Sequence, residues 1–212
     1  MTRIFDVHTL TASQKSEIAR ALSEGAVVVF PTDTVYGIGT GAFCEESTQK
    51  IYQLKNRPAT QPLQILTASV EQAQSVAIFN EAARKLASAY WPGALTLILP
   101  PSEKGKNLTR GFAGLGLRVP KYPPLTDILA QMSMPLSSTS ANLHGQPVLT
   151  DENEVLSAFA QKVDIIIKGG LLSPTASSVV DLTEKNPVLL REGALSKTDL
   201  EHILQEPLTR RG

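Results

Sequence analysis

Short apolar runs alternate with amphipathic segments along most of this chain, and that alternation restricts its fold more than any other feature. The runs AVVVF (26–30) and DIIIK (164–168) have wholly apolar centres, which is typical of strands covered on both faces. Between such runs, segments such as 11–25 carry apolar residues at helical spacing. This order predicts an α/β protein with a twisted, open, mixed sheet flanked by helices.

The expected elements cover almost the whole chain. Thr11 or Ser13 would cap the first helix and Gly25 would end it, while Ser196 would cap the last helix. Pro58 disfavours helical geometry at the residue before it, so the second helix should end there. Helices are expected at residues 11–25, 45–55, 70–79, 80–91, 123–132, 151–161 and 196–204. Seven or eight strands are expected, drawn from residues 26–31, 63–69, 95–100, 115–120, 135–139, 163–170, 177–182 and 187–193.

We expect a single domain over residues 1–212, because the chain has no internal repeat and no low-complexity linker. Its core is expected at about residues 13–193, followed by a C-terminal helix and a mobile tail within 194–212. The last two predicted strands, 177–182 and 187–193, are close enough in sequence to pair in antiparallel fashion.

Composition argues against several classes of protein. The 20 basic and 20 acidic side chains balance, which disfavours a surface devoted to nucleic acid but is compatible with a local basic groove. Cys44 is the sole cysteine, so no internal disulfide can form and a reducing compartment is expected. The first residues lack the apolar core of a signal peptide, and no apolar run is long enough to span a bilayer. We therefore expect a cytoplasmic protein that does not enter the membrane.

Two polar stretches, KNRP (55–58) and STSAN (138–142), have both an ordinary and a functional interpretation. Taken alone, Lys55 and Arg57 suit a solvated helix end, where cations stabilise the helix dipole. Alternatively they form a phosphate clamp, in which Arg57 supplies a planar fork, Lys55 a point charge and Pro58 stiffness. The hydroxyls and amide of the second stretch either donate to phosphate oxygens or cap the following segment.

Other strands also lead to polar residues. The stretch FPTDTVYGIGTGA (30–42) is expected to form a hydroxyl-rich turn after a buried strand, where open α/β sheets bind ligands, or its hydroxyls satisfy only their own backbone. Arg118 lies inside an apolar strand and needs a partner, either a structural carboxylate or a ligand carboxylate. A serine hydrolase is disfavoured because the G-x-S-x-G elbow is missing, although His144 follows Ser140 closely. The sequence has no residue cluster spaced for a protein-built metal site, and none is expected.

Seven motifs in one order, from about Gly25 to Gly193, resemble the YrdC-like family, the threonylcarbamoyl-AMP synthases. They are PTDTVYGIG, KNRPATQPL, WPGALTLIL, LGLRVP, STSAN-x-x-G-x-P, SSVVDL and LLREG. The resemblance implies a YrdC-like fold with a central concave cavity, in its short, single-domain form. It also implies a nucleotidyltransferase that converts L-threonine, bicarbonate and ATP into threonylcarbamoyl-adenylate and pyrophosphate.

The resemblance assigns the site residues by motif position. A K-x-R and S-x-N tetrad, implied to be catalytic and to line the ATP cavity, falls on Lys55, Arg57, Ser140 and Asn142. The implied ATP contacts are this tetrad, Gln61, Val148 through its backbone, and Arg191. The implied threonine contacts are Thr34, Arg118, Ser138 and Ser177. Mg²⁺ would arrive on the ATP phosphates. The product would serve threonylcarbamoyladenosine formation on tRNA, with a threonylcarbamoyl transferase complex as its downstream user.

Three different functions stay open beside this one. A non-catalytic protein of this fold could bind double-stranded or transfer RNA through the same concavity, widened by a basic patch at Lys104, Lys106, Arg110 and Lys121. A carbamoyl-phosphate-using relative within larger hydrogenase-maturation proteins would carry additional cysteine-rich and acylphosphatase domains. A YciO-like paralogue would lose parts of the tetrad, which this chain keeps whole. Leu66 stands where longer family members have a histidine, which is a departure at one threonine contact.

Overall fold

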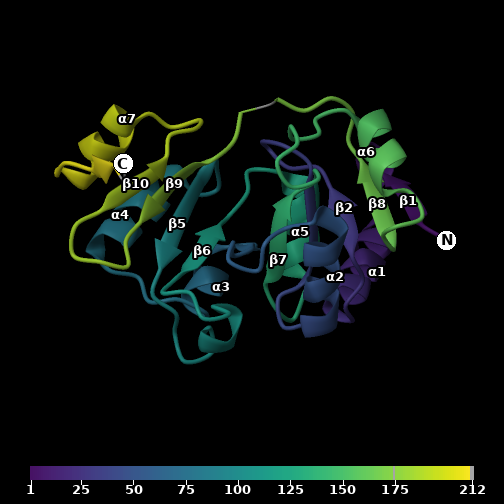
Figure 1. Ribbon diagram of the computed structural model, residues 1–212, viewed down its shortest axis with the longest axis horizontal. Helices are drawn as coiled ribbons and strands as arrows, with labels where there is room; N and C mark the ends of the chain where they lie inside the picture. The colour runs from purple at the N-terminus through teal and green to yellow at the C-terminus, as the bar shows by residue number, and fades with distance from the viewer. Residues whose placement is uncertain (174, 211–212) are drawn as a thin grey trace.

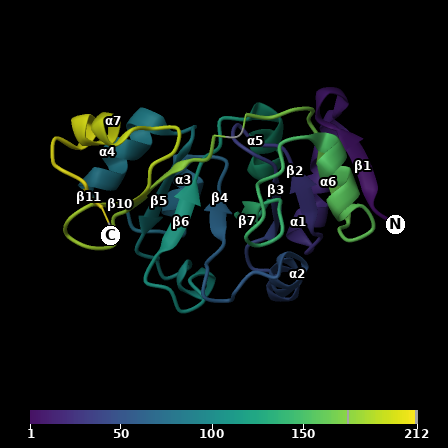
Figure 2. The same ribbon diagram turned by 45° about the horizontal axis from the view of Figure 1, so that its top comes forward.

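The computed structural model describes residues 1–173 and 175–210. The strands of this part of the chain form one sheet in the order β1-β8-β2-β3-β7-β4-β6-β5-β9-β10-β11. Neighbouring strands pair in both parallel and antiparallel fashion, as in β2 with β8 and β2 with β3 respectively. Figures 1 and 2 show a strongly twisted sheet with helices around it, β1 near one end and β10 near the other. The predicted α/β class and mixed open sheet are therefore confirmed.

The bounds of the elements are as follows. The strands are β1 (Arg3–Asp6), β2 (Val28–Phe30), β3 (Gly37–Gly41), β4 (Gln64–Leu66), β5 (Leu95–Leu99), β6 (Leu115–Arg118), β7 (Leu136–Ser140), β8 (Ile165–Lys168), β9 (Ser178–Asp181), β10 (Val188–Arg191) and β11 (Thr209–Arg210). The helices are α1 (Ala12–Ser23), α2 (Glu45–Lys55), α3 (Val70–Gln74), α4 (Glu81–Tyr90), α5 (Pro123–Ala130), α6 (Glu152–Phe159) and α7 (Lys197–Leu204), with short 3₁₀ turns at Val7–Thr9 and Lys106–Leu108.

Local sequence signals explain where the helices begin and end. Thr11 caps α1 in a capping box with Gln14, which satisfies two groups at the helix start. α2 ends at Lys55 because Asn56 adopts a left-handed conformation with φ of 51°. The main-chain N–H of Arg57 then donates to the carbonyl oxygen of Tyr52, at 2.9 Å. This turn fixes the start of the loop that carries Arg57.

β3 was expected to be part of a turn, and that expectation is wrong. Glycines allow this strand to lie between two close neighbours. A Cβ atom on Gly37 would lie 2.7 Å from the Phe30 ring, and one on Gly39 would lie 2.6 Å from the Ser137 carbonyl oxygen. The strand is recognisable only from the packing around it, because Gly-rich segments have low strand propensity.

Three further expectations are corrected. The helix expected at 70–79 ends at Gln74, and Ala77 bridges to Pro101 instead. The core extends beyond 13–193, because β1 pairs in parallel with β8. The tail is not free as far as Arg210, since Leu208 is 2% exposed and β11 pairs with β10. Residues 211–212, which were also expected to be mobile, lie outside the described residues.

The hydrophobic core has three parts, each between the sheet and a set of helices. α1 and α5 pack on one part, α2 and α6 on a second, and α3, α4 and α7 on the third. In β5, Leu95, Leu97 and Leu99 belong to the third part, whereas Thr96 and Ile98 point the other way, as the two-residue period of a strand requires. That other side of the central strands lines a cavity. None of the helices described here combines the length and apolarity that crossing a membrane would need.

Candidate active site

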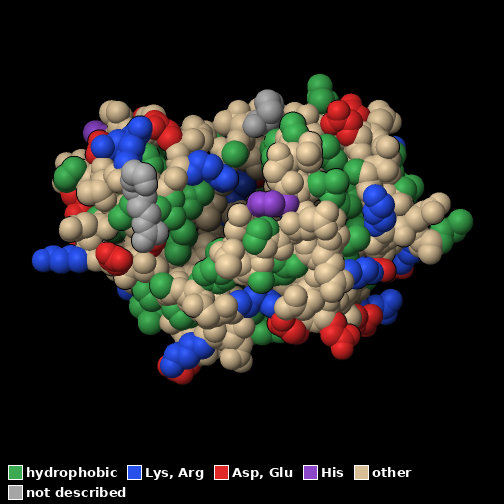
Figure 3. Space-filling model, viewed as in Figure 1, with side chains coloured by type: hydrophobic (Ala, Val, Ile, Leu, Met, Phe, Trp, Pro, Cys, Tyr) green, Lys and Arg blue, Asp and Glu red, His purple; other side chains and the backbone are tan. Residues whose placement is uncertain are grey.

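A cavity of about 450 Å³ lies over the central strands of the sheet. Its walls come from β4, β5, β6, β7, β9 and β10 and from the loops that follow β2 and α2. Figure 3 shows the molecule hollowed between its two halves, with basic side chains inside the hollow. The described residues that line it include three arginines and several hydroxyl groups, and no aspartate or glutamate. The cavity therefore suits an anionic ligand.

Nine of the eleven residues implied by the resemblance line this cavity. They are Thr34, Arg57, Gln61, Arg118, Ser138, Ser140, Val148, Ser177 and Arg191. They come from positions up to 157 residues apart (191 minus 34), which the sheet order brings together. Their contacts with substrates stay predictions. Lys55 and Asn142 do not contribute to the lining.

Lys55 does not line the cavity, and its predicted contact with a ligand stays a prediction. Its side chain is only 1% exposed. Its ammonium donates to the carbonyl oxygen of Ser140 at 2.5 Å, to the side-chain oxygen of Asn142 at 3.1 Å, and to the Asn142 carbonyl oxygen. These bonds use all three of its hydrogens, so none is left for a phosphate. Burial, followed by the nearby charge of Arg57, lowers the pKa of Lys55 to about 8.

Asn142 is also structural rather than cavity-lining. Its side-chain oxygen accepts from Lys55 and, at 2.5 Å, from the Ser140 hydroxyl. Its amide nitrogen donates to the carbonyl oxygens of Leu143 and Gln146, at 3.1 and 2.7 Å. The KNRP and STSAN stretches are therefore bonded to each other through Lys55 and Asn142, while Arg57 and Ser140 line the cavity. Together they hold the loop at the end of β7, so that Ser140 and Val148 form one wall of the cavity.

Arg57 does line the cavity, and its orientation is set by its own loop. Its Nε donates to the Gln61 carbonyl oxygen at 3.1 Å, and a terminal nitrogen donates to the Pro62 carbonyl oxygen at 2.9 Å. Three of the five guanidinium hydrogens therefore have no partner among these contacts. Burial lowers the pKa of Arg57, so an anionic ligand would stabilise its charged form.

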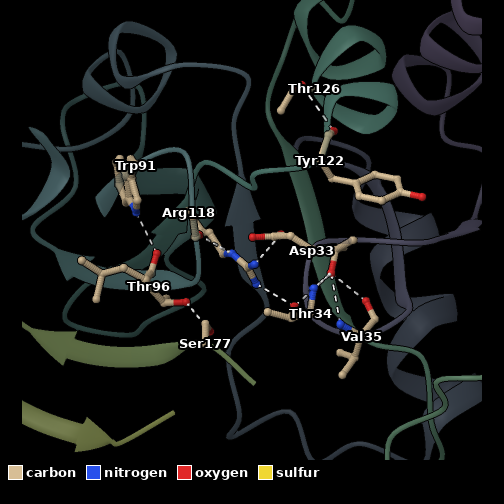
Figure 4. Close-up of polar contacts among 12 residues, drawn as sticks. Asp33, Thr34, Val35, Trp91, Thr96, Arg118, Tyr122, Thr126 and Ser177 are labelled. Carbon is tan, nitrogen blue, oxygen red and sulfur yellow. Dashed lines mark hydrogen bonds and ion pairs between the residues drawn. The ribbon is translucent and has the colours of Figure 1, made fainter. Parts of the chain in front are cut away.

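Arg118 is 4% exposed and lies at the end of β6, where Figure 4 shows it pointing toward the loop after β2. Its Nε donates to the Gly93 carbonyl oxygen at 2.9 Å. One terminal nitrogen donates to the Thr34 hydroxyl at 3.0 Å and the other to Asp33 at 2.5 Å. The structural ion pair anticipated from the buried arginine is thus present, and the guanidinium still lines the cavity.

Ser177 lies at the centre of a second polar network, part of which Figure 4 shows. Arg191 donates to its carbonyl oxygen at 3.0 Å and to its hydroxyl at 3.1 Å. The hydroxyls of Ser177 and Thr96 are 2.9 Å apart, and Gln64 donates to Thr96 at 3.0 Å. Burial, and then the neighbouring charge of Arg118, lowers the pKa of Arg191. Arg191 and Arg118 are therefore close enough to repel each other.

Sequence reasoning missed three residues of these networks: Asp33, Gln64 and Thr96. Gln64 and Thr96 are single polar residues inside apolar strands, LQIL and LTLIL. That pattern indicates a strand face turned toward a ligand rather than a core. Asp33 is adjacent to the predicted Thr34, but nothing local pairs it with Arg118, 85 positions away.

Three features outside the predicted site do not line the cavity. They are His144, the basic patch and Leu66. His144 is exposed, and its main-chain N–H donates to the Lys55 carbonyl oxygen. In the basic patch, Lys106 pairs with Glu103 and Arg110 with Glu45, each at 2.6 Å, so carboxylates neutralise two of its charges. Leu66 is buried in the apolar cluster under α5. Among the described residues, no group of three or more metal-binding side chains is found.

Comparison with known proteins gives consistent matches. The family model Sua5/YciO/YrdC, described as "telomere recombination", matches residues 20–193. A threonylcarbamoyl-AMP synthase of Pyrococcus abyssi is 38% identical over 97% of this chain, and one of Bacillus subtilis is 34% identical over 90%. The chain spans only 62% and 56% of the length of these two relatives.

A solved structure, P. abyssi Sua5 complexed with L-threonine, superposes on 99% of this chain with a TM-score of 0.92 at 36% identity. The chain covers 63% of that protein. The fold likeness extends over the cavity and its lining strands, because it includes nearly every residue of the chain. From the family match across most of its length and from these relatives, we conclude that the chain belongs to the Sua5/YciO/YrdC family.

Proposed function

We propose that this chain is an L-threonylcarbamoyladenylate synthase. Its substrates are L-threonine, bicarbonate and ATP, and its products are threonylcarbamoyl-AMP, pyrophosphate and water. The observation that carries the proposal is the cavity, where three guanidinium groups and a set of hydroxyls meet over the sheet without a carboxylate in the described lining. The names of the relatives and the threonine complex of P. abyssi Sua5 support the same reaction.

The lining residues suit two different ligands. Arg57 and Arg191 offer charge without a partner carboxylate among the described ion pairs, which suits the phosphates of ATP, together with Gln61, Ser140 and the backbone of Val148. Arg118, Thr34, Ser138 and Ser177 form a smaller polar surface that suits L-threonine. Lys55 and Asn142 support Ser140 and make no contact with the substrate.

The reaction requires positioning more than acid–base catalysis. The amine of L-threonine and bicarbonate form N-carboxythreonine and water. An oxygen of this carbamate attacks the α-phosphorus, and the bond to the β-phosphate oxygen breaks to release pyrophosphate. Negative charge develops on phosphate oxygens, so fixed guanidinium groups in a sheltered cavity stabilise the transition state. Mg²⁺ enters as part of the ATP substrate and neutralises phosphate charge.

The product is a mixed anhydride whose threonylcarbamoyl group is ready for transfer. We propose that it serves threonylcarbamoyladenosine formation on tRNA, through a threonylcarbamoyl transferase complex that accepts the group. The protein would then work in the cytoplasm, where tRNA is modified. Direct tRNA binding is not required by the cavity, since the small adenylate can diffuse to its user.

The test is incubation of the protein with ATP, Mg²⁺, bicarbonate and L-threonine, followed by detection of the adenylate by mass spectrometry and of pyrophosphate by a coupled assay. We expect threonine-dependent product, with less from L-serine and least from L-valine, because valine leaves polar groups of the cavity unpaired. Absence of the adenylate, together with salt-dependent RNA binding, would instead favour a non-catalytic RNA-binding protein.

A further inference from the structure

The three guanidinium groups of the cavity differ in how their charge is balanced. Arg57 and Arg191 donate only to uncharged oxygens in the contacts described. Arg118 instead forms an ion pair with Asp33 at 2.5 Å, and both side chains are largely buried, at 5% and 15% exposure. The Asp33–Arg118 pair therefore carries no net charge, while the other two arginines each contribute a full positive charge. The cavity is divided into a cationic part and a neutral, polar part.

Hydrogen-bond directions around Thr34 add to this difference. The Thr32 hydroxyl lies 2.7 Å from the Val35 carbonyl oxygen. A carbonyl can only accept, so the hydroxyl donates its single hydrogen in this bond. The Thr32 hydroxyl oxygen lies 2.9 Å from the Thr34 hydroxyl and also accepts from the main-chain N–H groups of Thr34 and Val35, at 3.1 and 3.2 Å, which uses both of its lone pairs. Thr34 accepts from Arg118. The Thr34 hydroxyl then keeps one lone pair, which accepts from a ligand N–H or O–H.

We propose that Asp33 is a specificity-determining residue, which makes the Thr34–Arg118 part of the cavity select a zwitterionic amino acid over anions that lack an ammonium group. This inference rests on the proposed function, which supplies the amino-acid substrate. Arg118 has two free N–H donors for the ligand carboxylate. The charge of Asp33 and the lone pair of Thr34 then favour a positive group on the same ligand. A simple anion gains less, because the charge that would attract it is already balanced.

The same balance separates the two substrates. With Arg118 neutralised, the phosphates of ATP are attracted to Arg57 and Arg191, and the amino-acid surface stays open. Asp33 does this without contacting the reacting atoms, through the charge that it places beside Arg118. Such a role differs from a purely structural one, because it changes the preference between ligands of different charge and not only their affinity.

The experiment compares two ligands by isothermal titration calorimetry: L-threonine, and (R)-3-hydroxybutanoate, which keeps the carboxylate, hydroxyl and methyl groups but has no ammonium. We expect the wild-type protein to bind L-threonine more tightly. Asp33→Asn keeps the size and an acceptor oxygen for Arg118 but removes the charge. It should reduce the ratio of the Kd for (R)-3-hydroxybutanoate to the Kd for L-threonine at least about tenfold. Asp33→Glu keeps the charge and should keep the ratio within about threefold of the wild-type value.

Asp127→Asn is the matched control, because it also removes a paired aspartate, here on the surface beside Lys15, and should leave the ratio unchanged. Asp33→Ser is a second neutral variant for the case that Asp33→Asn does not fold. Equal weakening of both ligands in the neutral variants would overturn the proposal, as would a loss of selectivity in Asp33→Glu. A wild-type protein that binds both ligands equally would overturn it while the proposed function stands. A wild-type protein that binds no L-threonine would overturn both.

Discussion

Replacing Lys55 by methionine tests whether this lysine is a structural residue or a phosphate ligand. Lys55 is 1% exposed, and its ammonium donates to two main-chain carbonyls and one side-chain oxygen of the Ser140–Asn142 segment. Methionine has a similar length and fills the same volume, so the substitution removes the donors without leaving a large cavity. We expect Lys55→Met to destabilise the fold and to disorder this wall of the active site.

The magnitude follows from the acceptors that lose their donor. The side-chain oxygen of Asn142 keeps the hydrogen of the Ser140 hydroxyl, and the Ser140 carbonyl oxygen still accepts from the main-chain N–H of Asn142, at 3.1 Å. Among the contacts described, only the Asn142 carbonyl oxygen is then left without a partner. Each buried, unsatisfied acceptor costs about 1 to 3 kcal/mol. Part of this cost is offset, because the ammonium no longer has to be buried. We therefore expect the free energy of unfolding to fall by about 1 to 2 kcal/mol, compared with the roughly 5 to 15 kcal/mol typical of a domain.

Urea unfolding followed by the fluorescence of Trp91, the single tryptophan, measures this change. With a slope of roughly 2 kcal/mol per molar urea, the midpoint should fall by roughly 0.5 to 1 M. Lys50→Met is the matched control: Lys50 is 48% exposed and 3.8 Å from Asp164, so its loss should cost less than about 1 kcal/mol. A Lys55→Met protein that unfolds like the wild type but no longer binds ATP would refute the structural role, since Lys55 would then be a ligand after all.

Three further predictions use the same assays. The pKa of Lys55 is about 8 in the folded protein and about 10.5 in the unfolded chain. Between these two pH values the unfolded chain binds this proton and the folded protein does not. The free energy of unfolding of the wild type, relative to Lys55→Met, should therefore rise by about 2.5 kcal/mol from pH 7 to pH 10, and a constant difference would contradict the lowered pKa. Arg57→Ala should lower kcat/KM for pyrophosphate release by about 100-fold or more with little change in urea midpoint; wild-type rates would remove Arg57 from the mechanism. Leu208→Ala should cost about 2 to 4 kcal/mol of unfolding free energy, whereas a mobile tail would tolerate it.

Elements whose periodicity is local were predictable from the sequence. α1 begins at a recognisable capping residue, Thr11, α2 ends just before a recognisable stop signal, Pro58, and β5 is an apolar run of strand length. β3 was not predictable, because its Gly-rich sequence forms a strand only through packing of Phe30 and pairing with β7. β11 was missed for a related reason. Its two residues form a strand only through pairing with β10, a contact that no local pattern encodes.

The candidate site shows the same division between local and long-range information. Motif order placed nine residues in the cavity, because the strands that carry them are themselves local features. The direction in which a side chain points was not predictable in this way. Lys55 and Arg57 are two positions apart at the end of one helix, yet one turns into the protein and the other into the cavity. The left-handed residue between them, Asn56, reverses the chain there, and its conformation depends on the loop that follows.

The arginines of the cavity explain how a site made from distant strands can be rigid. Each guanidinium has its Nε bonded to a main-chain carbonyl: Arg57 to Gln61, Arg118 to Gly93 and Arg191 to Ser177. A carbonyl in a strand or a tight loop moves little, so each planar fork is held in one orientation before any ligand arrives. The cost of ordering these long side chains is then met during folding and not during binding. Lysine has no second donor that could be fixed in this way, and this difference accounts for arginine at all three cavity positions.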